Sequence, residues 1–465
     1  MTLAGAVTAG IRYIFGLGAV TNLSDRFPWG LWIGFDVMSG VALAAGGFTI
    51  AATVHVFKLH RYRALLHPAI LTGFLGYVLV VGALLIDLGR PWNLWNILRP
   101  LFMFNSHSVM FEVAWCVILY TTVLALEFGQ VVLQRFRLWT LLRLTQLAIP
   151  PLVVAGVLLS TLHQSSLGAL FLIVPGKLYP LWFTPLLPVL FFISAVAVGL
   201  AMVTVEATLS ARAFHHEIEV PLFTDLGRAA AVVLSLYLGV RVIDLAVRGA
   251  WPLAFTGSVE SVMFLIELTA GVVLPLVLLV TPAARSRSGL AAASWLIVGG
   301  VVLNRVNVTV TGMLRRSGAT YVPAVGEILI TAGVVAAGVL AYLWIAEHLP
   351  VFEHEPAELV DAIEVASRGE TYLYPSMAKS LVSDYLRRVE AGEETDSYAQ
   401  LTAREREILK LLAEGYTSPE IAELLHLSVK TVSAHRQRIM EKLDLHRPAE
   451  LIKYAIRKGL VETDT

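Results

Sequence analysis

Long apolar runs recur along the first 350 residues of the chain, and they constrain its fold more than any other feature. A membrane-spanning α-helix needs about 20 mostly apolar residues. A transmembrane barrel would instead show alternation over strands of about 10 residues. We therefore predict an all-α fold with a polytopic transmembrane helix bundle of about nine spans. The predicted spans cover residues 30–56, 69–88, 108–128, 144–163, 181–209, 228–247, 259–281, 289–311 and 323–346.

Charged residues are distributed unevenly. The chain of 465 residues holds 35 basic and 35 acidic side chains, and about half of them follow residue 350. This divides the sequence into a membrane domain, residues 1–350, and a polar tail. One cysteine, Cys116, cannot close an internal disulfide, hold an iron–sulfur cluster or build a zinc site, so no metal site is predicted. The first residues lack the long apolar core of a cleavable signal peptide.

The end of the tail carries signals that begin and end short helices. Thr402 followed by Glu405 is a capping box, in which side chain and backbone satisfy each other at a helix start. Ser418 before Pro419 resembles an N-cap followed by proline, and Ser428 is a third N-cap. We predict a small soluble domain of four helices at residues 398–465. Its helices cover about residues 402–415, 418–426, 429–443 and 448–458.

The second and third of these helices match a helix-turn-helix, since they are joined by a tight turn and the third is basic on one face. We expect its first residues to face base edges and later basic residues to contact phosphates, which position a protein without specifying sequence. A module that binds only protein is the alternative. Predicted base-facing residues are Lys430, Thr431, Ser433 and Ala434. Predicted phosphate contacts are Arg436, Arg438 and Lys442. Predicted core residues are Ile408, Leu411, Leu412, Ile421, Leu425, Val432, Ile439 and Leu443.

The segment LTAREREILKLLAEGYTSPEIAELLHLSVKTVSAHRQRIMEKL resembles the LuxR/NarL-type output domain over about 65 residues. The resemblance implies DNA binding and dimerisation of this domain. The preceding ELVDAIEVASRGETYLYP is similar to the end of a response-regulator receiver. Residues 351–397 are therefore predicted to be a linker with short amphipathic helices at 356–367 and 375–389. The rest of that receiver is absent, so no phosphoacceptor aspartate is assigned.

An odd number of spans places the two ends of the chain on opposite sides of the membrane. A DNA-binding tail must be cytoplasmic, so the N-terminus should face outward across a bacterial inner membrane. Cytoplasmic loops carry an excess of Lys and Arg. The loops then assigned to the inside hold slightly more basic residues than those assigned to the outside, which agrees with this orientation.

Ionisable and amide side chains gather near one end of the predicted spans. With the N-terminus outside, all of them fall toward the outer side. Such residues are costly within a membrane and usually functional, so we predict a polar pocket in the outer leaflet. The alternative, open for any single residue, is that pairs such as Asp87 with Arg90 only hold helix ends together. The set comprises Asp36, Asp87, Arg90, His107, Glu112, His163, Gln164, Asp244, Glu260, Glu267, Asn304, Arg305 and Asn307.

A quinone ring would suit such a pocket. It needs donors to its two carbonyls and a carboxylate or histidine to exchange protons, and burial moves the pKa values of such groups toward neutrality. Glu112 and His163 are suited to that exchange. Bound haem would require histidines on facing helices, but His55 and His163 are expected at opposite ends of their spans. We therefore predict that the membrane domain lacks haem and receives electrons from a partner.

Six motifs carry a resemblance to the NrfD-like membrane subunits of polysulfide reductases, and in particular to the so-called cytochrome b subunits of nickel–iron hydrogenases. It covers roughly residues 11–350. The motifs are FPWGLWIGFDVMSG, LIDLGRPWN, NSHSVMFEVAWC, LALEF, TLHQSSLG and PGKLYPLWFTPLLP. Those subunits usually have one more helix before the FGLG segment. Here the chain is expected to begin at that segment, which fits an outward N-terminus.

The resemblance implies a haem-free subunit that exchanges electrons between menaquinone and an outer iron–sulfur (ferredoxin-like) partner, which serves a catalytic subunit. It also implies a quinone site near Glu112 and His163, with Asp87 and Arg90 close by. We assign Glu112, His163 and Asp87 as catalytic. Predicted quinone-binding residues are Asp36, Arg90, His107, Gln164, Asn304 and Arg305.

Three functional hypotheses remain at this stage. The first is a respiratory subunit with a vestigial or accidental regulator tail. The second is a one-component membrane sensor, in which quinone occupancy or redox state alters DNA binding. The third is a small-solute transporter, which is disfavoured because no internal repeat is evident.

Overall fold

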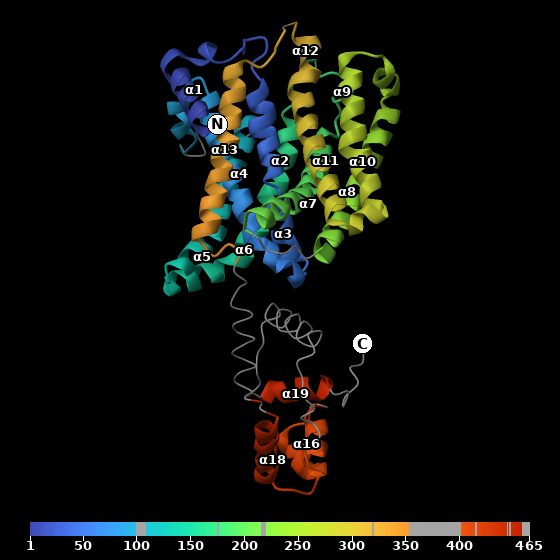
Figure 1. Ribbon diagram of the computed structural model, residues 1–465. Coiled ribbons are helices and arrows are strands. Elements are labelled where there is room, and N and C mark those ends of the chain that lie inside the picture. Colours follow the sequence, from blue (N-terminus) through green and yellow to red (C-terminus); the bar gives the residue numbers. More distant parts are fainter. Residues whose placement is uncertain are drawn as a thin grey trace. The chain divides into compact units, whose positions relative to one another are not determined.

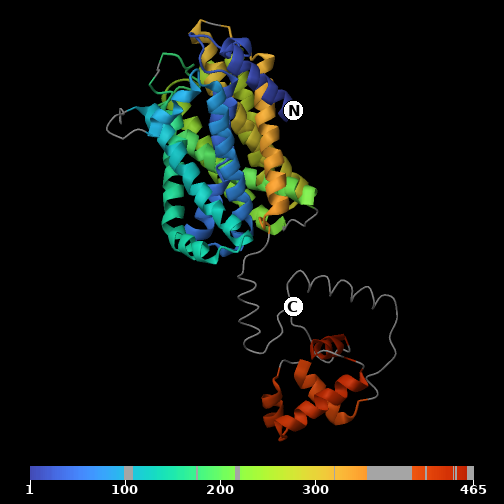
Figure 2. The same cartoon turned by 90° about the vertical axis from the view of Figure 1, so that its left-hand side faces the viewer.

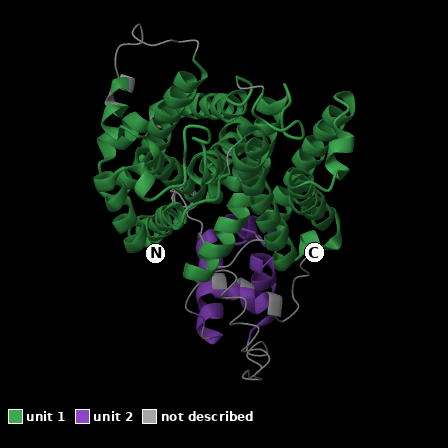
Figure 3. Ribbon diagram, turned by 90° about the horizontal axis from the view of Figure 1, so that it is seen from above, with its two compact units in different colours: residues 1–353 green, residues 354–465 purple. Residues whose placement is uncertain are grey.

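The computed structural model describes residues 1–98, 108–173, 176–214, 220–318, 320–352, 401–413, 416–443, 445 and 448–457. The chain forms two compact units, residues 1–353 and 354–465, coloured separately in Figure 3. We describe each unit by itself. The linker helices predicted at 356–367 and 375–389 lie outside the described residues.

The first unit is a helix bundle. Within the ranges described, nine helical stretches are long and apolar enough to cross a membrane, as the sequence predicted. They lie side by side in Figures 1 and 2. Six of them are each built on one continuous helix: α4 (Leu66–Asp87), α5 (Val109–Arg135), α6 (Trp139–Ala169), α7 (Leu187–Phe214), α8 (Val220–Val247) and α13 (Val325–His348).

The other three spans contain π-helical turns, which often mark functional positions. In each of these spans, one such turn holds or follows a polar residue that the sequence singled out: Asp36, Glu267 or Asn307. The first span joins π-helical Trp32–Ser39 to α2 (Gly40–Leu43), α3 (Gly46–Ala51) and π-helical Ala52–Val56. The seventh joins α9 (Val259–Leu268), π-helical Thr269–Val273 and α10 (Leu274–Val280). The eighth joins α11 (Arg287–Val306), π-helical Asn307–Thr311 and α12 (Gly312–Ser317).

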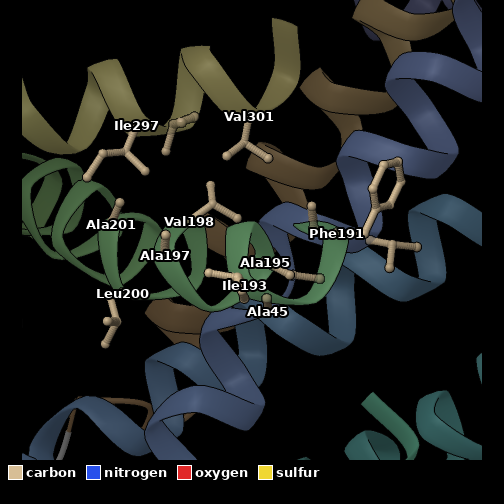
Figure 4. Packing of buried hydrophobic residues seen from close by; sticks show 14 of the residues in the cluster. Ala45, Phe191, Ile193, Ala195, Ala197, Val198, Leu200, Ala201, Ile297 and Val301 are labelled. Carbon is tan, nitrogen blue, oxygen red and sulfur yellow. The ribbon is translucent and has the colours of Figure 1, made fainter. Parts of the chain in front are cut away.

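Helix α7 forms the centre of the first unit, with residues buried all around its axis. A helix that is apolar on every side has no face suited to water, and it is stable only when other helices surround it. Small side chains such as Ala195, Ala197 and Ala201 allow close packing. Figure 4 shows them between α11, which contributes Ile297 and Val301, and the first span, which contributes Ala45. This centre fixes the helices that carry the polar residues.

Helix α6 continues past its predicted end. The polar sequence HQSSLG suggested a stop near residue 163, yet the helix runs to Ala169. The hydroxyls of Ser165 and Ser166 donate to the carbonyls of Leu162 and His163 within the same helix, at 2.9 and 3.1 Å. Their polarity is thereby satisfied without breaking the helix. His163 consequently lies inside the span and does not close it.

A helix not expected from the sequence precedes the nine spans. Helix α1 (Thr2–Phe15) packs against α13. The contact is very close: a Cβ placed on Gly5 would come within 2.8 Å of the Gly333 Cα atom, so only glycine fits there. With 14 residues, α1 is too short to meet the length expected of a span. Hydropathy alone therefore did not detect it.

The second unit contains four described helices, as predicted: α16 (Ala403–Ala413), α17 (Ser418–Leu424), α18 (Val429–Lys442) and α19 (Pro448–Arg457). Ile408, Ile421, Val432 and Ile439 are fully buried, and Leu443 is buried as well. Leu411, Leu412 and Leu425 pack against them, partly buried. The eight predicted core residues therefore form one core.

Two of the three predicted helix caps are confirmed and one is corrected. Thr402 and Glu405 form the capping box of α16, and the Ser428 hydroxyl accepts the Thr431 N–H at 3.1 Å. The second helix, however, is capped by Thr417 and not by Ser418. The Thr417 backbone N–H and hydroxyl both donate to Glu420 at 2.7 Å. Glu420 lies three residues after Thr417, which is the spacing that a capping box requires.

Candidate functional site

A group of buried polar side chains surrounds His163 in the first unit. His163 on α6 is fully buried, and neither ring nitrogen has a hydrogen-bond partner. The ring of Tyr77 on α4 lies 5.8 Å from the imidazole, and the ring of Tyr120 on α5 lies 4.8 Å from that of Tyr77. The Ser160 hydroxyl is one helical turn from His163. The Ser160 hydroxyl lies near the hydroxyls of Tyr77 and Tyr120, but none of the three makes a hydrogen bond of normal geometry.

Unpartnered polar atoms are rare in protein interiors, because each one loses its hydrogen bonds to water. Four such residues from three helices meet here, and we call Tyr77, Tyr120, Ser160 and His163 the histidine cluster. Gln164, the residue after His163 on α6, lies next to the histidine cluster. Its Nε2 atom donates to the Val41 carbonyl in the first span at 3.0 Å, while its Oε1 atom is unpartnered. The cluster therefore offers donors and acceptors to a small polar ligand.

A second polar group lies nearer the helix ends. Asp36 is buried and accepts the Thr331 hydroxyl at 2.9 Å, while its other oxygen is unpartnered. Asp87, at the end of α4, interacts electrostatically with Asp36 and Glu327. We call Asp36, Asp87 and Glu327 the outer carboxylate cluster. It brings together the first two spans and the last one.

Glu327 is held rigidly at the start of α13. Its Oε1 atom accepts the backbone N–H groups of Asn22 and Ala324 at 2.9 and 3.1 Å, and its Oε2 atom accepts the Tyr321 hydroxyl. Burial and the neighbouring carboxylate both raise the pKa of Tyr321 above its ordinary value. The phenol therefore keeps its proton and remains a donor. Glu327 was not predicted, although its position near the outer end of a span was a usable signal.

The two clusters lie at different depths. Tyr77 precedes Asp87 by ten residues on α4, and a rise of 1.5 Å per residue separates them by about 15 Å. The His163 ring lies 5.8 Å from that of Tyr77, so the same separation in depth lies between His163 and Asp87. The structure divides the single predicted pocket into a deep histidine cluster and a shallower carboxylate cluster.

Asn304 and Arg305 belong to a third network. Glu267 on α9 accepts the side-chain amides of Asn304 and Asn307 at 2.7 and 2.9 Å, and the Trp182 indole N–H at 2.9 Å. Arg305 donates to Asn304 and to the Ser194 hydroxyl, and it lies 3.6 Å above the Phe191 ring. These contacts tie α9 and α11 to α7. The side chains of Asn304 and Arg305 are therefore committed to structural partners.

Two predicted residues fall outside the buried groups. Glu112 is exposed in the first turn of α5, so the burial assumed for it is not found. Arg90 is exposed just after α4. His107 lies outside the described residues. Sequence analysis missed Tyr77, Tyr120 and Ser160, because a single hydroxyl in an apolar run carries no periodic signal. In the part of the chain that is described, no three His, Cys, Asp or Glu residues are grouped to hold a metal ion.

The candidate DNA interface is the face of α18. Lys430, Ser433, Ala434 and Arg438 are exposed there, and Thr431 and Arg436 are half-buried. Lys442 has a different environment, since its Nζ atom donates to buried Glu405 on α16 at 2.7 Å. Its charge is thus already paired. The remaining residues present the polar, basic surface that a recognition helix needs.

Glu405 links the cap of α16 to α18. Burial opposes its ionisation, but the hydrogen bond from Lys442 and those from the Thr402 backbone and hydroxyl outweigh it. Together they lower the pKa of Glu405 from 4.5 to about 2. The carboxylate therefore stays ionised and stabilises the unit at neutral pH.

Comparisons with known proteins cover both units. Residues 19–316 match the family Polysulphide reductase, NrfD, and residues 399–455 match the bacterial regulatory proteins of the luxR family. The probable Ni/Fe-hydrogenase 2 b-type cytochrome subunit of Escherichia coli K12 is 35% identical over 350 residues, which are 73% of this chain and 87% of that protein. The menaquinone reductase integral membrane subunit of Nitratidesulfovibrio vulgaris Hildenborough is 27% identical over 372 residues, 74% of this chain and 87% of its own length.

The oxygen regulatory protein NreC of Staphylococcus carnosus is 42% identical over 115 residues, which are 24% of this chain. The match spans only 53% of NreC. Both resemblances inferred from the sequence motifs are confirmed. The chain belongs to the NrfD polysulphide reductase family and carries a luxR-family DNA-binding domain in its C-terminal part.

Proposed function

We propose that the first unit is a haem-free subunit that exchanges electrons between menaquinone or menaquinol and an iron–sulfur partner, which serves a catalytic subunit in respiration. The observation that carries this proposal is the histidine cluster. A buried imidazole and three buried hydroxyls without partners fit the two carbonyl oxygens of a quinone ring. The name of the menaquinone reductase subunit, with which this chain aligns over 372 residues, supports the choice of quinone.

The histidine cluster would orient the quinone. The imidazole of His163 can donate from one nitrogen and accept at the other, so it can hold either a quinone carbonyl or a quinol hydroxyl. Tyr77 and Tyr120 can donate to the oxygen on the far side of the ring. Gln164 fixes α6 against the first span through its bond to Val41. These groups would bind the ring and hold its protons at the ring nitrogens of His163 and the hydroxyls of Tyr77 and Tyr120.

The outer carboxylate cluster would exchange the protons. Oxidation of a quinol releases two electrons and two protons, and the protons must reach water. Asp36 and Asp87 lie between the histidine cluster and the helix ends, where a carboxylate can receive a proton. We keep Glu112 and Arg90 as candidates for the outer entrance, because both are exposed near it. His107 remains a predicted quinone-binding residue outside the described ranges.

The proposal also covers Asn304, Arg305 and the absence of haem. We assign Asn304 and Arg305 to holding the quinone site in shape, because their side chains already bond to Glu267, Ser194 and each other. The absence of haem also stays a prediction. The hydrogenase relative is called a b-type cytochrome subunit, a name that gives no support to that prediction.

The orientation follows from the tail. A DNA-binding unit can act only in the cytoplasm, so we place residues 354–465 inside and the outer carboxylate cluster on the opposite face of a bacterial inner membrane. An iron–sulfur partner would then dock outside. The second unit would bind DNA as a dimer through α18, with Lys430, Thr431, Ser433 and Ala434 toward bases and Arg436 and Arg438 toward phosphates.

The test replaces His163 with leucine. We expect His163→Leu to lower quinol oxidation by the complete membrane complex at least about 100-fold, because removal of one buried catalytic proton carrier typically costs that much. The matched control is Leu162→Ala, since Leu162 is the neighbouring residue and is 51% exposed on the outer surface of α6. Normal turnover by correctly inserted His163→Leu protein would remove the assignment of the site.

A second function rests on a different observation. The described part of the second unit has its own apolar core, complete helix caps and an exposed polar face on α18, which favours a working domain over a vestigial one. It is therefore a candidate output domain of a membrane-bound regulator that senses quinone or redox state. DNA binding by the full chain that changes when a menaquinone analogue is added would support this function, and binding insensitive to the analogue would argue against it.

A further inference from the structure

The short helix α1 carries a buried cation into the outer end of the bundle. Arg12 is only 4% exposed, and it shares one face of the helix with buried Gly5 and Thr8. The opposite face is apolar and exposed, as Leu3 and Ile14 show. A buried arginine in an apolar environment is costly unless it is paired or hydrogen-bonded. Its partners therefore indicate why it is there.

Arg12 contacts the end of α4. Its guanidinium donates to the Leu88 carbonyl and interacts electrostatically with the neighbouring Asp87 carboxylate. Its Nε atom has no hydrogen-bond partner. Neighbouring Tyr13 donates from its hydroxyl to the Leu85 carbonyl at 3.1 Å, so α1 is fixed to α4 at two points. The Gly5–Gly333 contact fixes α1 to α13 at a third.

The charges around Arg12 are unbalanced. Three carboxylates interact electrostatically here. Asp87 on α4 is the middle one, and it interacts with Asp36 of the first span and with Glu327 of α13. Tyr321 donates to Glu327, and the Thr331 hydroxyl donates to Asp36. Asp87 instead precedes Leu88, whose carbonyl accepts the Arg12 guanidinium, so this cation acts on Asp87 from the adjacent residue. One cation can balance one carboxylate, so the charge of Asp87 depends on Arg12 more than the other two do.

We propose that Arg12 is a positioning residue that sets the charge of the outer carboxylate cluster, and with it the pH at which the quinone site exchanges protons. This inference rests on the proposed function. Arg12 acts through Asp87 and does not touch the quinone. Without the cation, nothing offsets the repulsion among the three carboxylates, and the cluster keeps a proton up to a higher pH.

The test uses the full chain in lipid nanodiscs and needs no partner subunit. The probe is a fluorescent hydroxyquinoline N-oxide, a quinone analogue whose affinity is measured from about pH 5 to about pH 9. We expect Arg12→Gln to move the midpoint of the pH dependence upward by about 1 to 3 units, as expected for loss of an adjacent opposite charge. Arg12→Lys keeps the charge and should stay close to wild type.

Three further variants separate charge from structure. Tyr13→Phe removes the other α1–α4 hydrogen bond and should leave the midpoint unchanged. Gly5→Val forces α1 away from α13, so it should shift the midpoint in the same direction as Arg12→Gln. In an Asp87→Asn background, Arg12→Gln should no longer shift it.

Each outcome decides something. An Arg12→Gln profile identical to that of the wild type, with normal analogue binding, overturns the inference while the proposed function stands. A shift that persists in the Asp87→Asn background also overturns it, because Arg12 would then act elsewhere. If the wild-type chain binds no analogue at any pH, the proposed function fails and this inference fails with it.

Discussion

Two sites, one in each unit of this chain, treat buried polar groups in opposite ways. In the membrane unit, His163, Tyr77, Tyr120 and Ser160 are buried with polar atoms that have no partner. In the second unit, buried Glu405 receives donors from Thr402 and from Lys442. The histidine cluster therefore keeps hydrogen-bonding capacity in the interior, whereas the Glu405 site uses such capacity to hold helices together.

The difference matches where each unit can meet its ligand. A lipid-soluble carrier enters between helices, so the groups that recognise it must be buried. DNA is met at the surface, so the recognition groups must be exposed, as Lys430, Ser433 and Arg438 are. We infer that unpartnered buried groups indicate function in the first unit, and that paired buried groups indicate stability in the second. Three predictions test what this contrast implies for the stability and the DNA binding of the second unit.

The largest effect is expected at Glu405. Its pKa is about 2 in the folded unit and 4.5 ordinarily, and each pH unit of such a difference is worth about 1.4 kcal/mol, or about 3 to 4 kcal/mol in total. A carboxyl whose pKa is lower in the folded state stabilises the fold at any pH above its unfolded pKa. That stability is lost as the pH falls through the folded pKa. The free energy of unfolding should therefore decline between about pH 4.5 and about pH 2. Circular dichroism of the fragment 398–465 measures it.

Glu405→Gln should remove most of that pH dependence and about 3 to 4 kcal/mol of stability at neutral pH. The matched control is Glu407→Gln. Glu407 is an exposed residue of the same helix, paired with Arg404 at 2.6 Å, and exposed pairs of this kind contribute little. Equal losses in the two variants would contradict the idea that buried pairing stabilises this unit.

A smaller effect is expected on the exposed face of α18. Lys430→Ala should weaken binding to a duplex selected from random sequences by about 1 to 3 kcal/mol, with relaxed sequence preference. Arg436→Ala should weaken binding to all sequences and lower the slope of log affinity against log salt by about one. Neither variant should alter the free energy of unfolding, because neither side chain is part of the core. Unchanged affinity in both would place DNA on another surface.

Much of this architecture could be predicted from the sequence, because it depends on local and periodic signals. The long apolar runs gave the nine spans, and three-residue spacings gave the caps at Thr402 and Ser428. The sequence could not show how far α6 continues, because Ser165 and Ser166 bond to their own helix. It also gave no sign that Glu112 is exposed or that Arg12 meets Asp87, since both depend on how helices face one another.

The smallest effect concerns the one cap that was misplaced. Thr417→Ala should lower the free energy of unfolding of the fragment 398–465 by about 1 kcal/mol, because it removes the hydroxyl that bonds to Glu420 in the capping box. Ser418→Ala is the matched control and should cost much less, since its hydroxyl does not cap α17. The measured order of the two losses decides which residue begins the helix. A larger loss for Ser418→Ala would mean that Ser418, and not Thr417, caps α17 in solution, as the Ser-Pro pair first suggested.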